Sequence, residues 1–115
     1  MEIKIEKCGN IIFAIILGDH LDASNAKEFK QDMTGLIEDG MVAVLDMSEL
    51  QFVDSSGLGA ILSCLRHLNK REGDLLLCGM TKPVRVLFEL VRMHRVFEIF
   101  NTREEAVRAL DQSHA

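Results

Sequence analysis

Two short stretches of the chain decide its fold, VAVLDM at residues 42–47 and FVDSSGLG at residues 52–59. The first is a nearly continuous apolar run, which is typical of a β-strand covered on both faces. The second leads through an acidic residue and two hydroxyls into an amphipathic helical pattern. This order predicts that Ser55 or Ser56 caps the helix, where unpaired backbone N–H groups and the helix dipole favour an anion. A hydroxyl there is either a simple cap or a site built to carry a phosphate.

Apolar runs and helical patterns alternate along the rest of the chain. Turn residues Gly9-Asn10 separate the first two strands and indicate a hairpin. Strands are expected at about residues 3–7, 11–17, 41–47, 74–79 and 96–100, and helices at about residues 25–38, 56–72, 82–91 and 103–110. Strands separated by helices favour parallel pairing with right-handed crossovers. The predicted fold class is α/β, with a mixed central sheet of about five strands and about four helices.

The first predicted helix and the extent of the domain complete this outline. Ser24 or Asn25 is expected to cap the helix. One apolar face is expected to hold Ala26, Phe29, Met33, Leu36 and Ile37. The length of the chain predicts a single domain over residues 1–115, with its core at about residues 3–110.

Composition argues against several classes of function. The net charge of −5 and the absence of Trp and Tyr argue against direct nucleic-acid binding. The N-terminus lacks a basic region followed by a long apolar run, and the apolar run at residues 11–17 is too short to span a membrane. A cytoplasmic protein without membrane insertion is therefore expected.

The cysteines and histidines do not form a recognisable metal or redox motif. Cys8, Cys64 and Cys78 are too widely spaced for a zinc knuckle or a redox pair, so buried free thiols are expected. The four histidines lack ligand spacing. Neither a metal nor a cofactor is therefore predicted.

A catalytic serine is the main enzymatic alternative. A nucleophile elbow needs Gly two residues before the serine, but the residues at that spacing before Ser55 and Ser56 are Val and Asp. A dinucleotide-binding loop that began at Gly57 would need its third Gly where Leu62 stands. No catalytic residue is therefore expected, and the chain is predicted not to be an enzyme.

The segment FVDSSGLG resembles the signature of the STAS domain, specifically that of the bacterial anti-sigma factor antagonists. Three other segments also resemble this family: the loop Gly18–Asp22, the strand Val44–Met47, and the stretch from Leu75 through Pro83 to Phe88. The resemblance extends over about residues 3–110 and implies a STAS-type single domain.

The resemblance implies a regulatory binding protein. In the family, the unmodified protein binds an anti-sigma factor and thereby frees the sigma factor. That anti-sigma factor is also a serine kinase, which inactivates its antagonist by phosphorylation, and a phosphatase reverses the modification. The phosphorylated residue is the first Ser after Asp, which is Ser55 here, with Ser56 as its neighbour. The implied partner-binding residues are Asp22, Asp54, Ser55, Ser56, Gly57, Leu58 and Gly59.

Four residues of this set have a structural alternative. Asp54 orients the hydroxyl or recruits the partner, or it only stabilises the start of the helix. Asp22 either contacts a partner or caps the first helix. Gly57 and Gly59 either let a partner backbone approach closely or permit tight packing of the helix on a strand.

A second kind of binding function also stays open. STAS-like domains also serve as scaffold pieces of stress-sensing complexes and as cytoplasmic subunits of membrane transporters. Two segments depart from the pattern of the antagonists: the loop Gly18–Asp22 holds an extra residue, and Met93–Arg95 replaces a small, Gly-containing turn. Both departures leave the identity of the partner open.

Overall fold

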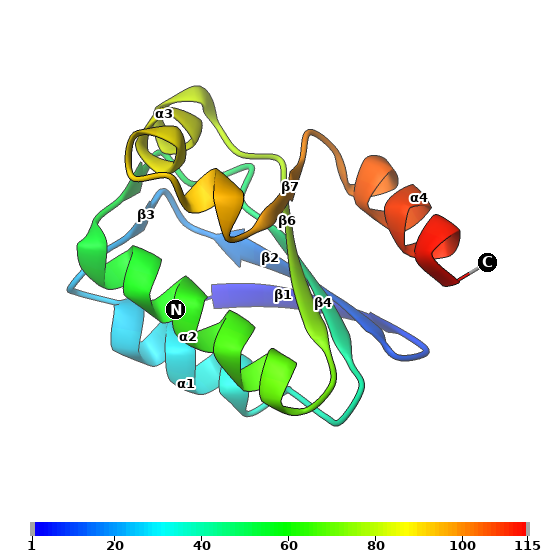
Figure 1. Cartoon of the computed structure of the whole chain (residues 1–115). Helices are drawn as coiled ribbons and strands as arrows, with labels where there is room; N and C mark the ends of the chain where they lie inside the picture. Colours follow the sequence, from blue (N-terminus) through cyan, green and yellow to red (C-terminus); the bar gives the residue numbers. More distant parts are fainter. Residues whose placement is uncertain (1, 115) are drawn as a thin grey trace.

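The computed structural model describes the backbone of residues 2–114 and the side chains of residues 2–111 (Figure 1). Within this range the main sheet has five strands in the order β1-β2-β4-β6-β7. These strands are β1 (Glu2–Cys8), β2 (Ile11–Leu17), β4 (Val42–Asp46), β6 (Asp74–Cys78) and β7 (Glu98–Phe100). A separate small sheet pairs β3 (His20–Leu21) with β5 (Phe52–Val53). The helices are α1 (Ala26–Thr34), α2 (Ser55–Lys70), α3 (Lys82–Leu90), the short 3-10 helix η1 (Met93–Arg95) and α4 (Arg103–His114).

The main sheet is mixed, as the sequence predicts. β1 and β2 form an antiparallel hairpin, and its turn contains Gly9 at φ 62°, a left-handed conformation that glycine adopts without strain. β2, β4, β6 and β7 pair in parallel with their neighbours. In the register of β4, Ala43 lies between Ile12 of β2 and Leu75 of β6. The parallel strands therefore end at one common edge, where the helices begin.

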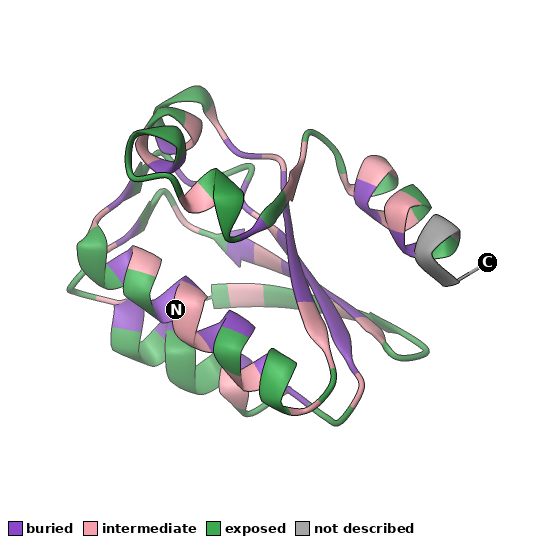
Figure 2. Cartoon of the chain, in the orientation of Figure 1, coloured by how far each residue is buried: buried purple, intermediate pink, exposed green. Residues whose placement is uncertain are grey.

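Helices cover the two faces of this sheet unequally. α1 and α2 lie side by side on one face, and α4 lies on the other (Figure 1). Alternate residues of β4 serve both layers: Ala43 and Leu45 join the core beneath α1 and α2, whereas Val42 and Val44 join the core beneath α4. Figure 2 shows the buried residues concentrated along the central strands. The continuous apolar run in the sequence follows from this burial on both faces.

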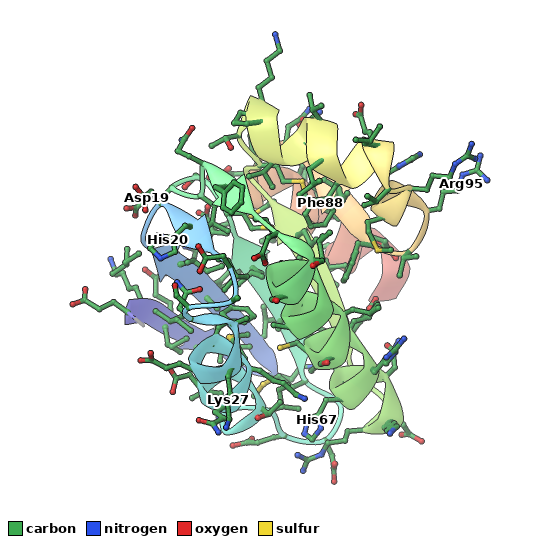
Figure 3. The ribbon with its side chains drawn as sticks, turned by 90° about the vertical axis from the view of Figure 1, so that its left-hand side faces the viewer. Asp19, His20, Lys27, His67, Phe88 and Arg95 are labelled. Atoms are coloured by element: carbon green, nitrogen blue, oxygen red, sulfur yellow. The ribbon has the colours of Figure 1, made fainter. Side chains whose placement is uncertain are left out.

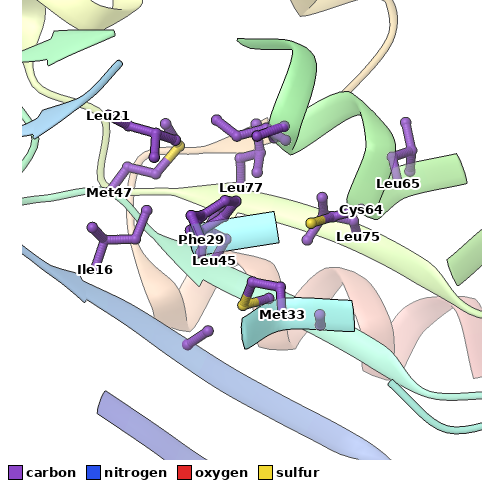
Figure 4. Close-up of a cluster of buried hydrophobic side chains, with 14 of the residues drawn as sticks. Ile16, Leu21, Phe29, Met33, Leu45, Met47, Cys64, Leu65, Leu75 and Leu77 are labelled. Atoms are coloured by element: carbon purple, nitrogen blue, oxygen red, sulfur yellow. The ribbon is translucent and has the colours of Figure 1, made fainter. Parts of the chain in front are cut away.

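The larger core is formed by α1, α2 and the sheet. Phe29 and Met33 of α1 point toward Leu45 of β4, and Cys64 of α2 lies close by (Figure 4). Phe29 is fully buried, and Met33 is 1% exposed. Burial of one such side chain stabilises the fold by about 1.5–3 kcal/mol, so these contacts fix α1 and α2 against the sheet.

The structure differs from the predicted elements in two places. α1 ends at Thr34, and Gly35 follows as its C-cap, so Leu36 and Ile37 lie beyond the helix and not on its apolar face. The Thr34 hydroxyl donates a hydrogen bond of 2.8 Å to the carbonyl of Lys30, which supports this early end. The two-residue strands β3 and β5 and the helix η1 were not predicted, because elements this short have no detectable period.

Candidate functional site

The start of α2 is built by Asp54 and not by a serine. Asp54 occupies the N-cap position with an extended backbone, and its Oδ1 accepts a hydrogen bond of 2.9 Å from the backbone N–H of Gly57. The prediction that Ser55 or Ser56 caps the helix is therefore wrong. A carboxylate one residue earlier already satisfies the N–H group three positions along the helix, and Ser55 is the first helical residue.

The two serine hydroxyls are exposed and are not used by the fold. Neither Ser55 nor Ser56 makes a side-chain hydrogen bond to another residue that the structure describes. Both stand in the first turn of α2, where backbone N–H groups lack partners within the helix. A negative group attached to Ser55 would lie at the positive, N-terminal end of the dipole of α2, which would stabilise it.

Asp54 also joins α2 to the loop that precedes α1. Its Oδ2 accepts a hydrogen bond of 3.2 Å from the N–H of Ala23, and its own N–H donates one of 3.3 Å to the carbonyl of Leu21. The pairing of β3 with β5 places Leu21 opposite Val53 in the same region. The predicted loop Gly18–Asp22 and the FVDSSGLG segment are therefore neighbours in space, although they are far apart in the sequence.

The two glycines of the segment have different surroundings. Gly57 is buried, and a Cβ atom on it would lie 2.2 Å from the carbonyl oxygen of Leu21 and 3.0 Å from Val53 Cγ1. Gly59 is exposed, and a Cβ atom on it would have no neighbouring atom within 4 Å. Close packing of α2 against Leu21 of β3 therefore explains why residue 57 is glycine, whereas Gly59 faces open space.

A shallow groove runs between α1 and α2 beside the serines. Small side chains and two lysines line it: Ala26, Lys27, Lys30, Ser56, Gly59, Ala60 and Ser63. Lys27 projects outward from α1 (Figure 3). Leu58, by contrast, is half-buried and packs against the larger core. Of the predicted contact residues on α2, Ser55, Ser56 and Gly59 are thus open to solvent, and Leu58 is only partly so.

Asp22 organises the turn before α1. Its Oδ1 accepts hydrogen bonds of 2.9 Å from the N–H of Ser24 and 2.5 Å from the Ser24 hydroxyl. The hydrogen bond from the Ser24 hydroxyl is the main reason that the pKa of Asp22 lies below its ordinary value. The Asp22 carbonyl accepts a hydrogen bond of 2.8 Å from Ala26, and Asn25 Oδ1 accepts one from the Asp22 N–H. Asn25 stands at the N-cap position but makes no side-chain cap bond.

Two residues that the sequence did not identify lie at the edge of this site. Asp19 Oδ1 and His20 Nδ1 are 2.9 Å apart, and both side chains are exposed (Figure 3). This hydrogen bond raises the pKa of His20, with a smaller contribution from the charge of Asp22, and it lowers the pKa of Asp19. An adjacent Asp-His pair in the loop was the only signal for this contact in the sequence.

The described residues offer little for metal or nucleophilic chemistry. No three His, Cys, Asp or Glu side chains among them come together as a ligand set. Burial raises the pKa of the Cys64 and Cys78 thiols to about 11, so both stay protonated and poorly nucleophilic. Cys8 is exposed, so the expectation of a buried thiol is wrong for this residue. None of the described helices is long and apolar enough to cross a bilayer.

Comparison with known proteins shows the family. The family model described as the STAS domain matches residues 2–106. The chain therefore belongs to the STAS domain family, which confirms the resemblance seen in FVDSSGLG. A curated relative, the anti-sigma-B factor antagonist of Listeria monocytogenes, is 28% identical over 92 residues, which cover 79% of this chain and 81% of the relative.

Solved structures share the fold but carry different descriptions. The Bacillus cell fate determinant SpoIIAA in its phosphorylated form is 20% identical, covers 95% of this chain and 99% of its own, and superposes with a TM-score of 0.68. A sulfate transporter family protein from Wolinella succinogenes is 18% identical, covers 91% of this chain and 88% of its own, and has a TM-score of 0.77. The shared fold therefore does not identify the function of the chain, which must be argued from the residues of the site.

Proposed function

We propose that this chain is an anti-sigma factor antagonist, that it binds an anti-sigma factor with serine kinase activity, and that phosphorylation of Ser55 switches this binding off. The observation that carries the proposal is that Asp54 caps α2 and leaves the Ser55 hydroxyl exposed, without a hydrogen bond to any residue that the structure describes. The name of the Listeria relative supports the class of partner, and the description of phosphorylated SpoIIAA supports the modification. A phosphatase that removes the phosphate completes the cycle.

The charge of a phosphate explains how the switch works. Phosphorylation of Ser55 adds about −1.5 to −2 charges beside the Asp54 carboxylate. Two like unit charges about 5 Å apart at an effective dielectric constant near 20 repel each other by roughly 3 kcal/mol. One acidic group of the partner at that distance from the phosphate would therefore lower the affinity by about two orders of magnitude. The dipole of α2 offsets only about 0.3–2 kcal/mol of this, and it stabilises the phosphorylated chain itself.

The predicted contact residues divide into two roles in this proposal. Ser55, Ser56, Leu58 and Gly59 form the surface of α2 that touches the partner. Asp22, Asp54 and Gly57 hold the neighbouring loop and the first turn of α2 in place. The hydrogen bonds of Asp22 and Asp54 to backbone N–H groups and the close approach of Gly57 to Leu21 support the second role.

The remaining parts of the proposal concern the whole chain. Residues 1–115 act as one STAS domain, in the cytoplasm, without direct nucleic-acid binding, and the partners are the kinase and the phosphatase. The chain spans most of the length of the Listeria relative, which supports the single-domain assignment.

A pull-down from native lysate with matched variants tests the switch. The baits are the wild-type chain, Ser55→Asp and Ser55→Ala, with Ser56→Asp to compare the effect of a charge on the neighbouring contact residue of the same turn. Wild type and Ser55→Ala are expected to retain an anti-sigma kinase identified by mass spectrometry, and Ser55→Asp to lose about two orders of magnitude in affinity for the purified kinase. Incubation of that kinase with ATP is expected to modify wild type at Ser55 and to leave Ser55→Ala unmodified.

Two results would overturn the proposal. If Ser55→Asp retained the kinase as well as wild type does, the electrostatic account of the switch would be wrong. If all four baits retained the same transporter or scaffold proteins and no kinase, the chain would instead act as a subunit of a transporter or of a stress-sensing complex.

A further inference from the structure

Helix α3 has apolar residues on both its buried and its exposed side. Val84 and Phe88, one turn apart, are buried against the core. Val86 and Leu90, also one turn apart and on the opposite side, are 54% and 78% exposed. Lys82 and Glu89 of α3 are also exposed, and Arg85 is half-buried, so the outer side of the helix places two large apolar side chains among charged ones.

The exposed apolar surface continues beyond the end of α3. Val91 and Val96, on either side of η1, are 40% and 48% exposed. Among the described residues, four of the seven large apolar side chains that are exposed lie between residues 86 and 96. Single exposed apolar residues are ordinary, but several of them within one short segment of the chain favour an interaction surface. We call this group, Val86, Leu90, Val91 and Val96, the α3–η1 surface.

Positive charge surrounds the α3–η1 surface. Residues 82–95 carry four basic side chains and one acidic one, a net charge of +3, whereas the remaining residues carry nine basic and seventeen acidic ones, a net charge of −8. Lys82, Arg92 and Arg95 are exposed, and none of them forms an ion pair with a side chain that the structure describes. Arg95 extends away from the body of the molecule (Figure 3). The most basic part of an acidic chain is therefore also its most apolar exposed part.

We propose that the α3–η1 surface docks an acidic amphipathic helix of a partner protein. Leucine-like side chains of that helix would cover Val86 and Leu90, and its carboxylates would meet Lys82, Arg92 and Arg95. α3 has nine residues, a length of roughly 14 Å, which matches two to three turns of a docked helix. The inference does not depend on the Ser55 switch, because none of these residues takes part in it.

The charge of the α3–η1 surface favours an acidic helix over a second copy of the chain and over a membrane. A second copy joined by two-fold symmetry would place one +3 surface against another, which is unfavourable. An extended anionic membrane would also bring lipid charges toward a chain that carries seventeen acidic side chains outside residues 82–95. A single helix is narrow enough to contact only the basic region.

A hollow beside α3 gives such a helix an anchor point. The hollow measures about 140 Å³ and is lined by three apolar side chains, Met80, Phe88 and Ile99, together with Arg85, Glu89, His94 and Asn101. Arg85 stands at its rim, held by a hydrogen bond of 2.6 Å from its Nη2 to Asn101 Oδ1. An apolar side chain of the partner can enter there. Because the Glu89 carboxylate also lines the hollow, the carboxylates of the partner are expected at Lys82, Arg92 and Arg95 and not in the hollow.

A peptide of about 18 residues with Leu on one helical face and Glu on the other is the probe. Its fluorescence anisotropy with the wild-type chain is compared with that of a scrambled peptide of the same composition and of a peptide with Lys in place of Glu. The Leu/Glu peptide is expected to bind at least about tenfold more tightly than either. In amide NMR spectra it is expected to shift residues of α3 and η1.

Matched variants distinguish binding at the α3–η1 surface from nonspecific binding elsewhere on the chain. Leu90→Ser and the pair Lys82→Glu with Arg95→Glu are expected to weaken binding about tenfold or more. Leu17→Ser and Lys70→Glu, which change an exposed apolar and an exposed basic residue elsewhere, are expected to leave it unchanged. Ser55→Asp is also expected to leave it unchanged, so this proposal and the proposed function fail separately. Circular dichroism checks that each variant is folded.

Three results would overturn the inference. The first is equal binding of the three peptides, or binding that Leu90→Ser does not weaken. The second is concentration-dependent dimerisation in sedimentation experiments that Leu90→Ser abolishes, which would make a second copy the occupant. The third is binding of phosphatidylserine vesicles in the absence of any binding of the Leu/Glu peptide, which would make a lipid surface the occupant.

Discussion

The two sides of the first turns of α2 are used in opposite ways. On the inner side, the Asp54 carboxylate accepts hydrogen bonds from the N–H groups of Ala23 and Gly57. Gly57 also lies so close to the Leu21 carbonyl that there is no room for a Cβ atom. On the outer side, Ser55, Ser56 and Gly59 are exposed. A single eight-residue signature therefore contains residues that build the site and residues that a partner can touch.

This difference means that a modification of Ser55 would leave the cap of α2 in place. The capping hydrogen bond is made by Asp54, so a phosphate on Ser55 would not remove a contact on which the fold depends. The residues open to modification on the outer side are thereby separate from the contacts that stabilise the fold on the inner side. Substitutions on each side of α2 test this separation.

The largest effect is expected at the two glycines. Gly57→Ala places a Cβ atom 2.2 Å from the Leu21 carbonyl oxygen, a backbone atom that cannot move without opening the β3–β5 contact, and is expected to destabilise the fold by about 2–3 kcal/mol. Gly59→Ala fills open space on an exposed helix and is expected to stabilise it by about 0.5–1 kcal/mol. Urea denaturation of both variants gives the two free energies of unfolding. Equal effects of the same sign would show that the two sides of α2 are not different.

An intermediate effect is expected at Asp54. Asp54→Ala removes the cap bond to Gly57 and the bond to Ala23, and is expected to lower the free energy of unfolding by about 1–2 kcal/mol. Ser55→Ala removes an exposed hydroxyl without a described partner and is expected to change it by no more than about 0.5 kcal/mol. Asp54→Asn keeps an oxygen acceptor for the cap and should fall between the two. An Asp54→Ala variant as stable as Ser55→Ala would contradict the capping role.

The main architecture could be predicted because its signals are long. Apolar runs such as residues 42–47 and 74–79, separated by helical patterns, were sufficient to predict the parallel part of the sheet, and Gly9-Asn10 was sufficient to predict the hairpin. The early end of α1 was missed because Leu36 and Ile37 continue the helical spacing and Ile37 is buried even outside the helix. Burial alone does not show which element carries an apolar residue.

The sequence was sufficient to locate the site but not to assign a role to each of its residues. The order of acidic residue, hydroxyls and glycines marked the start of a helix, yet three adjacent residues, Asp54, Ser55 and Ser56, are all common N-caps. Only the extended backbone of Asp54 and the hydrogen bond that its carboxylate accepts from the Gly57 N–H decide among them. The neighbouring loop was recognised by resemblance, but its attachment through β3 and β5 depends on a contact between distant segments, which periodicity does not report.

The smallest effect is expected at the loop side of the site, where His20 and Asp19 form an exposed pair. The hydrogen bond that the His20 ring donates to the Asp19 carboxylate raises the pKa of His20, so the protonated imidazole is favoured in the folded chain. Its contribution to stability is therefore fully present below about pH 6.5, the usual value for histidine, and is lost as the pH rises through the higher folded value. Asp19→Asn is expected to move the NMR titration midpoint of the His20 ring downward toward the usual value. The control Asp32→Asn, on the exposed side of α1, is expected to leave that midpoint unchanged. An unchanged midpoint in Asp19→Asn would show that the pair does not persist in solution, and that the loop is held at the site only through Asp54 and the β3–β5 pairing.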